Sequence, residues 1–220
     1  MAVLTRAVVF DFDGVLADSE PLHLAVYQEL FAALGATLTR EDYYANYLGF
    51  DDDGVFRAMA AAQAWQMDDT RITALIDQKA RVFDDLIRSR EVLFPGAAAC
   101  VERLARGFPL GIASGALKHE IQTILRATRL ERHFRFIVAS GDTPNSKPAP
   151  DPYARAARLH GLPPSACVAI EDSRWGIVSA KQAGLPCVGI TNTYPASELT
   201  DADVIISSLE EFTAELIEKL

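Results

Sequence analysis

Two aspartates, Asp11 and Asp13, follow the apolar run Val8-Val9-Phe10 and precede Gly14. Such a run is typical of a strand buried inside an α/β sheet, so Asp11 would lie at the strand's carboxyl end, where open parallel sheets place their active sites. Residues two apart in extended chain point the same way, so both carboxylates can face one site. A divalent cation could compensate their buried charge. The alternative is that both aspartates only form the turn that ends the strand.

Three later segments carry polar residues where an apolar run ends. Ser114 and Gly115 offer a hydroxyl and free backbone N–H groups to an anion, and Lys147 lies in a proline-stiffened segment that would fix where its ammonium points. Glu171 and Asp172 end the third segment. If all these ends belong to one parallel sheet, the polar groups share one edge of it.

Each of these residues also has a simpler interpretation. Ser114 could cap a helix, and Lys147 could be a solvated loop lysine. Glu171 and Asp172 could be acids in a first helical turn, which the helix dipole favours. Only their common position at strand ends favours a shared site.

The elements that must position these residues follow from hydrophobic spacing. The predicted strands are Val8–Phe10, Leu110–Ala113, Phe136–Ala139, Cys167–Ile170, Cys187–Ile190 and Val204–Ile206. The predicted helices are Ser19–Leu34, Thr39–Leu48, Asp53–Ala64, Asp69–Arg90, Ala97–Arg106, Lys118–Ala127, Pro152–His160, Trp175–Ala183 and Leu209–Lys219.

Repeated β-α units after the first helical block predict an α/β fold with a doubly wound, Rossmann-like parallel sheet. The first strand must join that sheet across an all-helical block. We therefore expect an α/β core made of residues 1–16 and 93–220, with residues 17–92 inserted as a separate helical domain.

Composition narrows the partners. The chain has 220 residues, of which 50% are hydrophobic, and a net charge of −9, which disfavours nucleic acid and anionic membranes. No apolar run is long enough to span a membrane, and the N-terminus does not resemble a secretion signal. The 3 cysteines lack metal-ligand spacing and suit a reduced, cytoplasmic protein. We expect a monomer.

Four ordered motifs resemble those of the haloacid dehalogenase-like phosphatases. Asp11-Phe12-Asp13-Gly14-Val15-Leu16 is similar to the first motif, Ser114 to the second, Lys147 to the third, and Glu171-Asp172-Ser173 with Gly176 to the fourth. The resemblance covers the whole chain. The helical insertion looks like the mobile cap of the subgroup that contains β-phosphoglucomutase and small-molecule phosphatases.

The resemblance implies a role for each motif. Asp11 would attack phosphorus and form an aspartyl-phosphate, and Asp13 would protonate the leaving oxygen and later deprotonate water. Ser114, Gly115 and Lys147 would bind the phosphoryl oxygens. Dehalogenases of the family lack an acid at the place of Asp13, so phosphorus chemistry is favoured here.

The resemblance also implies Mg²⁺ as the cofactor, which suits an oxygen-only site. Asp11, the carbonyl of Asp13 and Asp172 would hold the ion, with Glu171 close by.

Substrate choice would belong to the helical insertion. His23 and Lys79 lie where mutase-like members carry cap residues that face the substrate, although a surface histidine and a lysine paired with Asp77 are equally simple interpretations. After Leu48-Gly49, where β-phosphoglucomutase has an arginine that grips a second phosphate, this chain has Asp52 within Asp51–Asp53. An aspartate there disfavours a bisphosphate, unless these acids only start a helix.

We therefore expect a Mg²⁺-dependent phosphatase whose partner is a small phosphate ester, such as a sugar phosphate. A β-phosphoglucomutase-like mutase is the first alternative. A phospho-accepting receiver domain is a second, which the helical insertion disfavours. A dinucleotide-binding protein lacks support because the first strand is not followed by a glycine fingerprint. Trp175 is expected to pack or to form a lip of the cleft.

Overall fold

A computed structural model describes residues 6–47, 50, 52–89 and 92–220. Within it the chain divides into two compact units. The first unit ends at Asp18 and resumes at Val92, and the second runs between them from Ser19. No helix among the described residues is long and apolar enough to cross a membrane.

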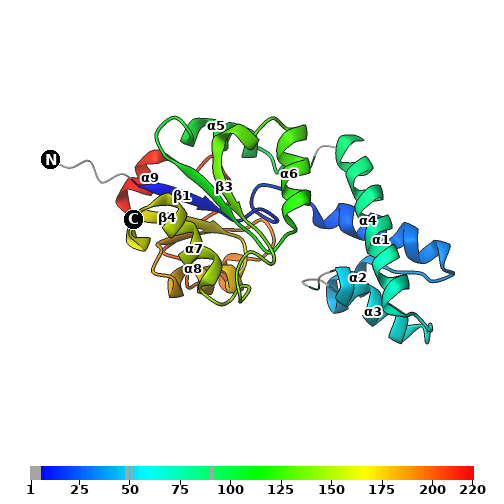
Figure 1. Ribbon diagram of the computed structural model, residues 1–220. Coiled ribbons are helices and arrows are strands. Elements are labelled where there is room, and N and C mark those ends of the chain that lie inside the picture. The colour runs from blue at the N-terminus through cyan, green and yellow to red at the C-terminus, as the bar shows by residue number, and fades with distance from the viewer. Residues whose placement is uncertain (1–5, 48–49, 51, 90–91) are drawn as a thin grey trace. The chain divides into compact units, whose positions relative to one another are not determined.

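The first unit is built on one parallel sheet (Figure 1). Its six strands lie in the order β3-β2-β1-β4-β5-β6, and every pairing is parallel. The strands are β1 (Ala7–Phe10), β2 (Leu110–Ala113), β3 (Phe134–Val138), β4 (Cys167–Glu171), β5 (Cys187–Ile190) and β6 (Val204–Ile206). The chain leaves β1 in both directions, so the sheet is doubly wound, as the sequence predicted.

Helices cover both faces of this sheet, with α5 and α6 on one face and α7 and α8 on the other (Figure 1). The helices of this unit are α5 (Ala97–Leu104), α6 (Lys118–Ala127), α7 (Asp151–His160), α8 (Arg174–Gln182) and α9 (Ala214–Lys219). Three short 3₁₀ helices, Glu131–His133, Pro164–Ala166 and Ala196–Glu198, lead into or follow strands. Because both faces are covered, the inner strands are apolar up to the last residue of β4, Glu171, and every residue of β1, β2 and β4 is buried.

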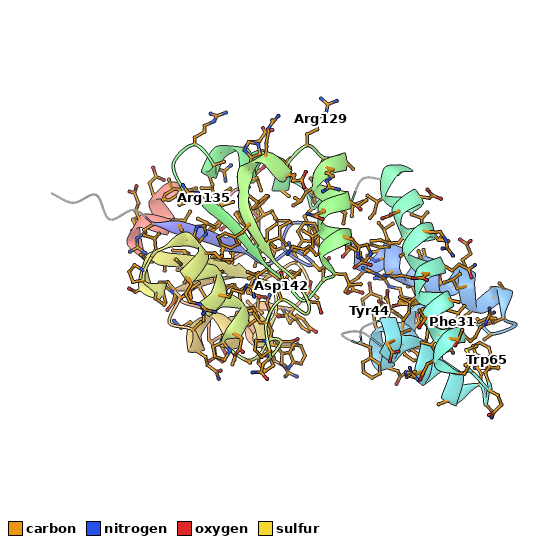
Figure 2. The ribbon with its side chains drawn as sticks, in the orientation of Figure 1. Phe31, Tyr44, Trp65, Arg129, Arg135 and Asp142 are labelled. Carbon is orange, nitrogen blue, oxygen red and sulfur yellow. The ribbon has the colours of Figure 1, made fainter. Side chains whose placement is uncertain are left out.

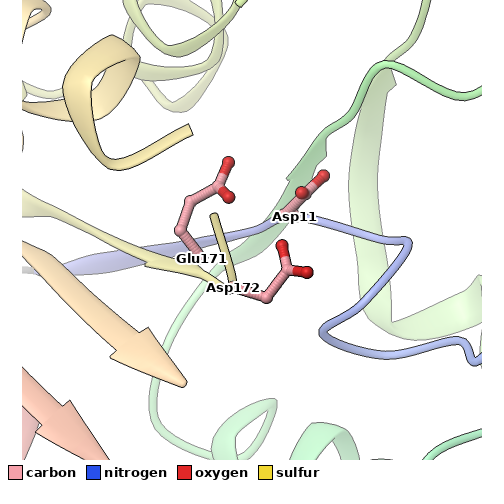
Figure 3. A group of neighbouring side chains, drawn as sticks. All are labelled: Asp11, Glu171 and Asp172. Carbon is pink, nitrogen blue, oxygen red and sulfur yellow. The ribbon is translucent and has the colours of Figure 1, made fainter. Parts of the chain in front are cut away.

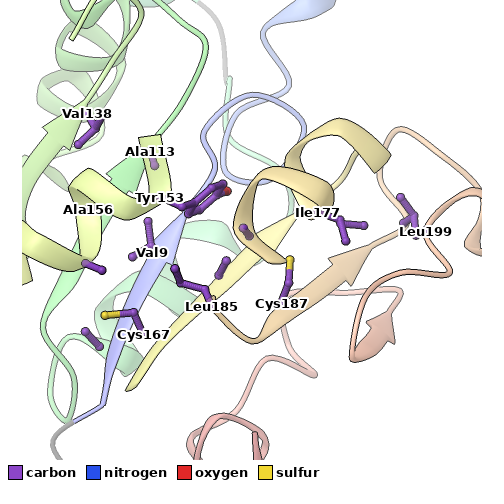
Figure 4. Packing of buried hydrophobic residues seen from close by; sticks show 14 residues of the cluster. Val9, Ala113, Val138, Tyr153, Ala156, Cys167, Ile177, Leu185, Cys187 and Leu199 are labelled. Carbon is purple, nitrogen blue, oxygen red and sulfur yellow. The ribbon is translucent and has the colours of Figure 1, made fainter. Parts of the chain in front are cut away.

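The core between the sheet and its α7–α8 layer is continuous (Figure 4). It joins Val9 of β1, Tyr153 of α7 and Ile177 of α8. Cys167 and Cys187 belong to it, and all 3 cysteines are buried and free. These cysteines therefore act as small apolar core residues in the structure.

The second unit is wholly helical over its described residues. Its helices are α1 (Glu20–Ala33), α2 (Arg40–Asn46), α3 (Asp52–Ala62) and α4 (Asp69–Ser89). Aromatic rings fill its interior: Phe31 lies 5.9 Å from Tyr27, 5.6 Å from Phe56 and 6.3 Å from Trp65, centroid to centroid (Figure 2). This unit thus has a core of its own, as a separately folding helical insertion requires.

Every predicted strand and helix has a counterpart among the described residues, and one boundary was clearly wrong. The last helix begins at Ala214 rather than Leu209, because Ser207 donates from its N–H and its hydroxyl to Glu211, which holds the intervening segment in a turn. Thr213 then caps the helix by accepting from the N–H of Leu216. Predictions that involve Leu48, Gly49, Asp51, Arg90 and Glu91 lie outside the described residues.

Candidate active site

The first chemical group of the site is the carboxylate that follows β1. Phe10 pairs with Ile112 of β2 and Ile170 of β4, and the N–H of Asp11 donates to the carbonyl of Ile170 at 3.0 Å. Asp11 is only 7% exposed, and its Oδ1 accepts from the N–H of Phe12 at 2.7 Å. The pairing of β1 with both of its neighbours, β2 and β4, therefore fixes the position of this carboxylate.

The chain turns sharply after these residues, at Gly14. Its φ is +77°, and an added Cβ would lie 1.9 Å from Oδ2 of Asp172. Any side chain would collide with that carboxylate, so glycine is required twice, for its backbone conformation and for the close approach. The turn thereby brings the first motif against the fourth.

Two further acids lie at the end of β4: Glu171 is its last residue, and Asp172 follows it (Figure 3). Glu171 is fully buried and Asp172 is 6% exposed. The hydroxyl of Ser173 lies 3.3 Å from Oε2 of Glu171 and accepts from the N–H of Gly176 at 3.1 Å, as the cap of α8. A Cβ on Gly176 would overlap the Glu171 carboxylate, so α8 can pass this close only with glycine there.

Lys147 forms ion pairs with the acids at the ends of β1 and β4. Its Nζ lies 2.9 Å from Oδ1 of Asp11 and 2.5 Å from Oε1 of Glu171. The hydroxyl of Tyr153, from α7, donates to the same Oε1 at 2.7 Å. With only 13% of its side chain exposed, Lys147 is not the solvated loop lysine of the alternative interpretation.

Ser114 completes the edge from the β2 side. It is 4% exposed, its N–H donates to the carbonyl of Val138, and its hydroxyl accepts from the N–H of Ala116 at 3.1 Å. The residue that caps α6 is Leu117, so Ser114 does not serve as that cap. Gly115, next to it, is exposed and leaves its backbone open to a ligand.

We refer to Asp11, Glu171 and Asp172 as the acid cluster. The negative charges of this cluster are not fully compensated. Three carboxylates, those of Asp11, Glu171 and Asp172, offer oxygens within 4.8 Å of one another, against the one ammonium of Lys147. Burial, followed by repulsion from Asp11, raises the pKa of both Glu171 and Asp172. Burial lowers the pKa of Lys147, but Asp11 and Glu171 more than offset this and raise it above the usual range.

A divalent metal ion fits this site. Three carboxylates less one ammonium leave about two negative charges, and all three available ligands are oxygens, which Mg²⁺ prefers. The Asp13 carboxylate does not belong to this group of three carboxylates. The sequence predicted that Asp13 would bind the ion through its backbone carbonyl. Asp13 itself is half-buried in the turn after β1.

The two predicted substrate residues of the helical unit, His23 and Lys79, lie close together. The ring of His23 stacks on Phe83 at 4.3 Å, and the Lys79 ammonium lies 4.6 Å from the same ring. Burial, and then the charge of Lys79, hold the pKa of His23 well below its usual value. Lys79 is therefore buried beside a neutral imidazole.

Asp52 neutralises that lysine. Its Oδ1 lies 3.1 Å from Nζ of Lys79 and accepts from the hydroxyl of Tyr27 at 2.5 Å. Asp52 is the first residue of α3, so it does start a helix, but its carboxylate is committed to Lys79 and Tyr27. Asp52 therefore does more than start a helix, whereas Asp51 lies outside the described residues.

Sequence reasoning missed three residues of the site. Tyr153 binds Glu171, Asn192 donates to the carbonyl of Gly14 at 2.8 Å, and the hydroxyl of Thr193 hydrogen-bonds Asp172. The one available signal for the last two was their place after a predicted strand, Cys187–Ile190, at the same edge as the motifs.

Comparison with known proteins identifies the family. Residues 5–184 match the model of the haloacid dehalogenase-like hydrolases. The chain belongs to this family. Its predicted family and its enzyme class, a hydrolase, are thereby confirmed.

Individual relatives agree with that assignment over nearly their full length. The chain is 32% identical to protein CbbY of Rhodobacter capsulatus, covering 98% of each chain, and 31% identical to hexitol phosphatase B of Escherichia coli K12, covering 94% of each. The structure of CbbY from Rhodobacter sphaeroides with phosphate is 29% identical, with a TM-score of 0.85 over 98% of this chain and 100% of that one. A variant of that protein has been solved with xylulose-1,5-bisphosphate.

Proposed function

We propose that this protein is a Mg²⁺-dependent phosphatase that hydrolyses a small phosphorylated metabolite through an aspartyl-phosphate on Asp11. The observation that carries the proposal is the buried Asp11 carboxylate, held by Lys147 at 2.9 Å beside two more buried acids. The phosphatase named among its relatives supports the same reaction class.

Asp11 supplies the nucleophile. Its Oδ1 is engaged by the N–H of Phe12 and by Lys147, so Oδ2 is the oxygen that attacks phosphorus. The attack forms the Asp11–phosphorus bond as the bond from phosphorus to the ester oxygen breaks. Because two buried contacts hold the carboxylate, little reorganisation is needed before the attack.

Asp13 moves the proton in both half-reactions. It gives a proton to the departing ester oxygen, and the resulting carboxylate then takes one from the water that attacks the aspartyl-phosphate. The products are the free alcohol and inorganic phosphate, and Asp11 and Asp13 regain their starting states.

Lys147, Ser114 and Gly115 stabilise the phosphoryl group as its charge spreads over three oxygens. An ammonium has three N–H donors, and Asp11 and Glu171 accept from two, so the third can serve a phosphoryl oxygen. The Ser114 hydroxyl and the exposed backbone after it provide neutral donors.

Asp11, Asp172, Glu171 and the Asp13 carbonyl would hold Mg²⁺. Once bound, the ion would offset the repulsion between the incoming phosphate dianion and the buried carboxylates. The raised pKa values of Glu171 and Asp172 support this, because burial and then repulsion from Asp11 disfavour both charged carboxylates in the protein alone.

We propose further that His23 contacts the substrate, that the fully buried Lys79 acts on it only through His23, and that the substrate carries one phosphate. With Asp52 paired to Lys79 and the His23 imidazole neutral, His23 and Lys79 together present no net positive charge, and His23 offers the hydrogen bond. Such a pair suits the hydroxyls of a sugar or polyol rather than a second phosphate. A mutase must hold a bisphosphate intermediate, so the same pair disfavours mutase activity.

The test is a panel of esters assayed for release of inorganic phosphate with and without Mg²⁺. It should include hexitol phosphates and xylulose-1,5-bisphosphate, since one relative is named for the former and another was solved with the latter, together with sugar monophosphates. We expect Mg²⁺-dependent turnover, fastest on a monophosphate. Isomerisation of β-glucose 1-phosphate without phosphate release would instead favour the mutase. A cytoplasmic location and a monomeric state stay predictions.

A further inference from the structure

The loop that follows β5 reaches the acid cluster at Asp172, whereas Lys147 contacts Asp11 and Glu171. None of the four motifs includes it. The loop starts at Thr191, whose N–H donates to the carbonyl of Ile206 in β6 at 3.1 Å, so the neighbouring strand anchors it. Its next two residues, Asn192 and Thr193, each touch a different part of the site.

Asn192 holds the turn of the first motif. Its Nδ2 donates to the carbonyl of Gly14 at 2.8 Å, while the N–H of Gly14 donates to the carbonyl of Ala17 at 2.9 Å. The peptide groups on both sides of Gly14 are therefore tied. The carbonyl of Asp13 belongs to one of these groups, so its direction depends on the same turn.

Thr193 holds the carboxylate of the fourth motif. Its hydroxyl hydrogen-bonds Asp172, and its Oγ1 lies 2.8 Å from the point where a Cβ on Gly14 would be. The hydroxyl, the Gly14 backbone and the Asp172 carboxylate are thus in contact at one point. Rotation of the carboxylate would break the hydrogen bond, so Thr193 selects one orientation of Asp172.

We infer that Asn192 and Thr193 are positioning residues for the Mg²⁺ site, Asn192 through the Asp13–Gly14 turn and Thr193 through the Asp172 carboxylate. The inference rests on the proposed function, because it assumes that Asp172 and the Asp13 carbonyl bind the ion. Groups that orient metal ligands contribute to metal affinity although they do not touch the metal.

The measurement is the Mg²⁺ dissociation constant by isothermal titration calorimetry on the full chain. Thr193→Val keeps the size of the side chain and removes the hydroxyl, so we expect affinity to fall roughly tenfold or more. Thr193→Ser restores the hydroxyl and should bind within about threefold of the parent. Asn192→Ala, the second variant, should also lose roughly tenfold. Thr123→Val, on the exposed face of α6, is the control and should change nothing.

Each outcome bears on a distinct claim. If the parent binds Mg²⁺ and both Thr193→Val and Asn192→Ala bind it equally well, the inference is wrong and the proposed function stands. If the parent itself does not bind Mg²⁺, the metal assignment of the proposed function fails and this inference fails with it. Melting temperatures in EDTA that match the parent's would show that an affinity loss is not unfolding.

Discussion

Lys147 Nζ lies 2.9 Å from Oδ1 of Asp11, so a lysine from the loop before α7 reaches the carboxylate at the end of β1. Replacing Lys147 by Met keeps the length of the side chain and removes the charge. We expect kcat to fall by at least roughly 100-fold, since the transferring phosphoryl group loses a preorganised donor. Steady-state phosphate release is the measurement. Lys181→Met, which removes a lysine paired with Asp203 at the surface, should keep full activity.

The charge imbalance of the acid cluster predicts how Mg²⁺ and Asp172 affect stability. Mg²⁺ should raise the melting temperature of the parent, by an amount equivalent to about 2.7 kcal/mol at a hundredfold excess over the dissociation constant. Asp172→Asn should raise the melting temperature in EDTA, because burial and Asp11 disfavour the charged form of Asp172, and it should remove most of the Mg²⁺ effect.

Asp142→Asn is the matched control for that variant. Burial raises the pKa of Asp142, but the N–H of Ala139 and the ammonium of Lys118 more than offset this and lower it. Its charged form therefore stabilises the fold, and Asn should lower the melting temperature while leaving the Mg²⁺ response intact. A decrease for both variants in EDTA would contradict the imbalance at Asp172.

His160 should make stability depend on pH. It packs against Phe136, and burial, then Arg135, lowers its pKa to about 4. The unfolded chain takes up a proton near pH 6.5 and the folded one only near 4, so the free energy of unfolding should fall as pH decreases through this window. The slope is at most about 1.4 kcal/mol per pH unit.

Urea denaturation at pH 7 and pH 5, in EDTA, tests this against His160→Leu. The raised pKa values of Glu171 and Asp172 act in the opposite direction, but they contribute equally to both proteins and cancel in the comparison. The parent should lose more stability than the variant on acidification. Parallel losses would contradict a neutral His160 in the fold.

Asp52 and Asp53 are neighbouring acids in different environments. Asp52 pairs with buried Lys79, whereas Asp53 pairs with exposed Arg57. Asp52→Asn should cost about 3 kcal/mol of unfolding free energy, because it leaves a buried ammonium without its counter-ion. Asp53→Asn should cost less than about 1 kcal/mol. Urea denaturation measures both, and equal losses would contradict the assigned role of Asp52.

Removing the Asp52 charge that neutralises Lys79 should also change substrate preference. If the charge balance between Asp52 and Lys79 excludes a second phosphate as proposed, Asp52→Asn should raise kcat/KM for xylulose-1,5-bisphosphate relative to a monophosphate. An unchanged ratio in a folded variant would mean that the Asp52–Lys79 pair does not set specificity.

The sequence allowed the strand ends to be predicted because three of the site residues follow an apolar run directly. Asp11, Ser114 and Glu171 all do so, and a parallel sheet brings such ends together. Contacts made by side chains far along the chain could not be predicted this way. The pairing of Tyr153 with Glu171 depends on how α7 packs on the sheet, and that of Asn192 with Gly14 spans 178 residues.

The same distinction explains two details that the sequence did not predict, the partner of Lys79 and the start of the last helix. Lys79 has Asp77 nearby in sequence, but its partner is Asp52, carried by another helix. The start of the last helix was placed too early because Leu209 and Phe212 fit a helical spacing, whereas their burial comes from a turn that Glu211 holds. Periodicity identifies buried residues, and capping hydrogen bonds decide where the helix begins.

The central claim is tested most directly by multiple-turnover phosphate release from the best ester, with the parent and Asp11→Asn measured side by side in Mg²⁺. The parent should release many phosphates per molecule, and Asp11→Asn, which keeps the shape of the residue but removes the nucleophile, should release none above background. Undiminished release by a folded Asp11→Asn variant would contradict the account, because the phosphoryl group would then not pass through Asp11.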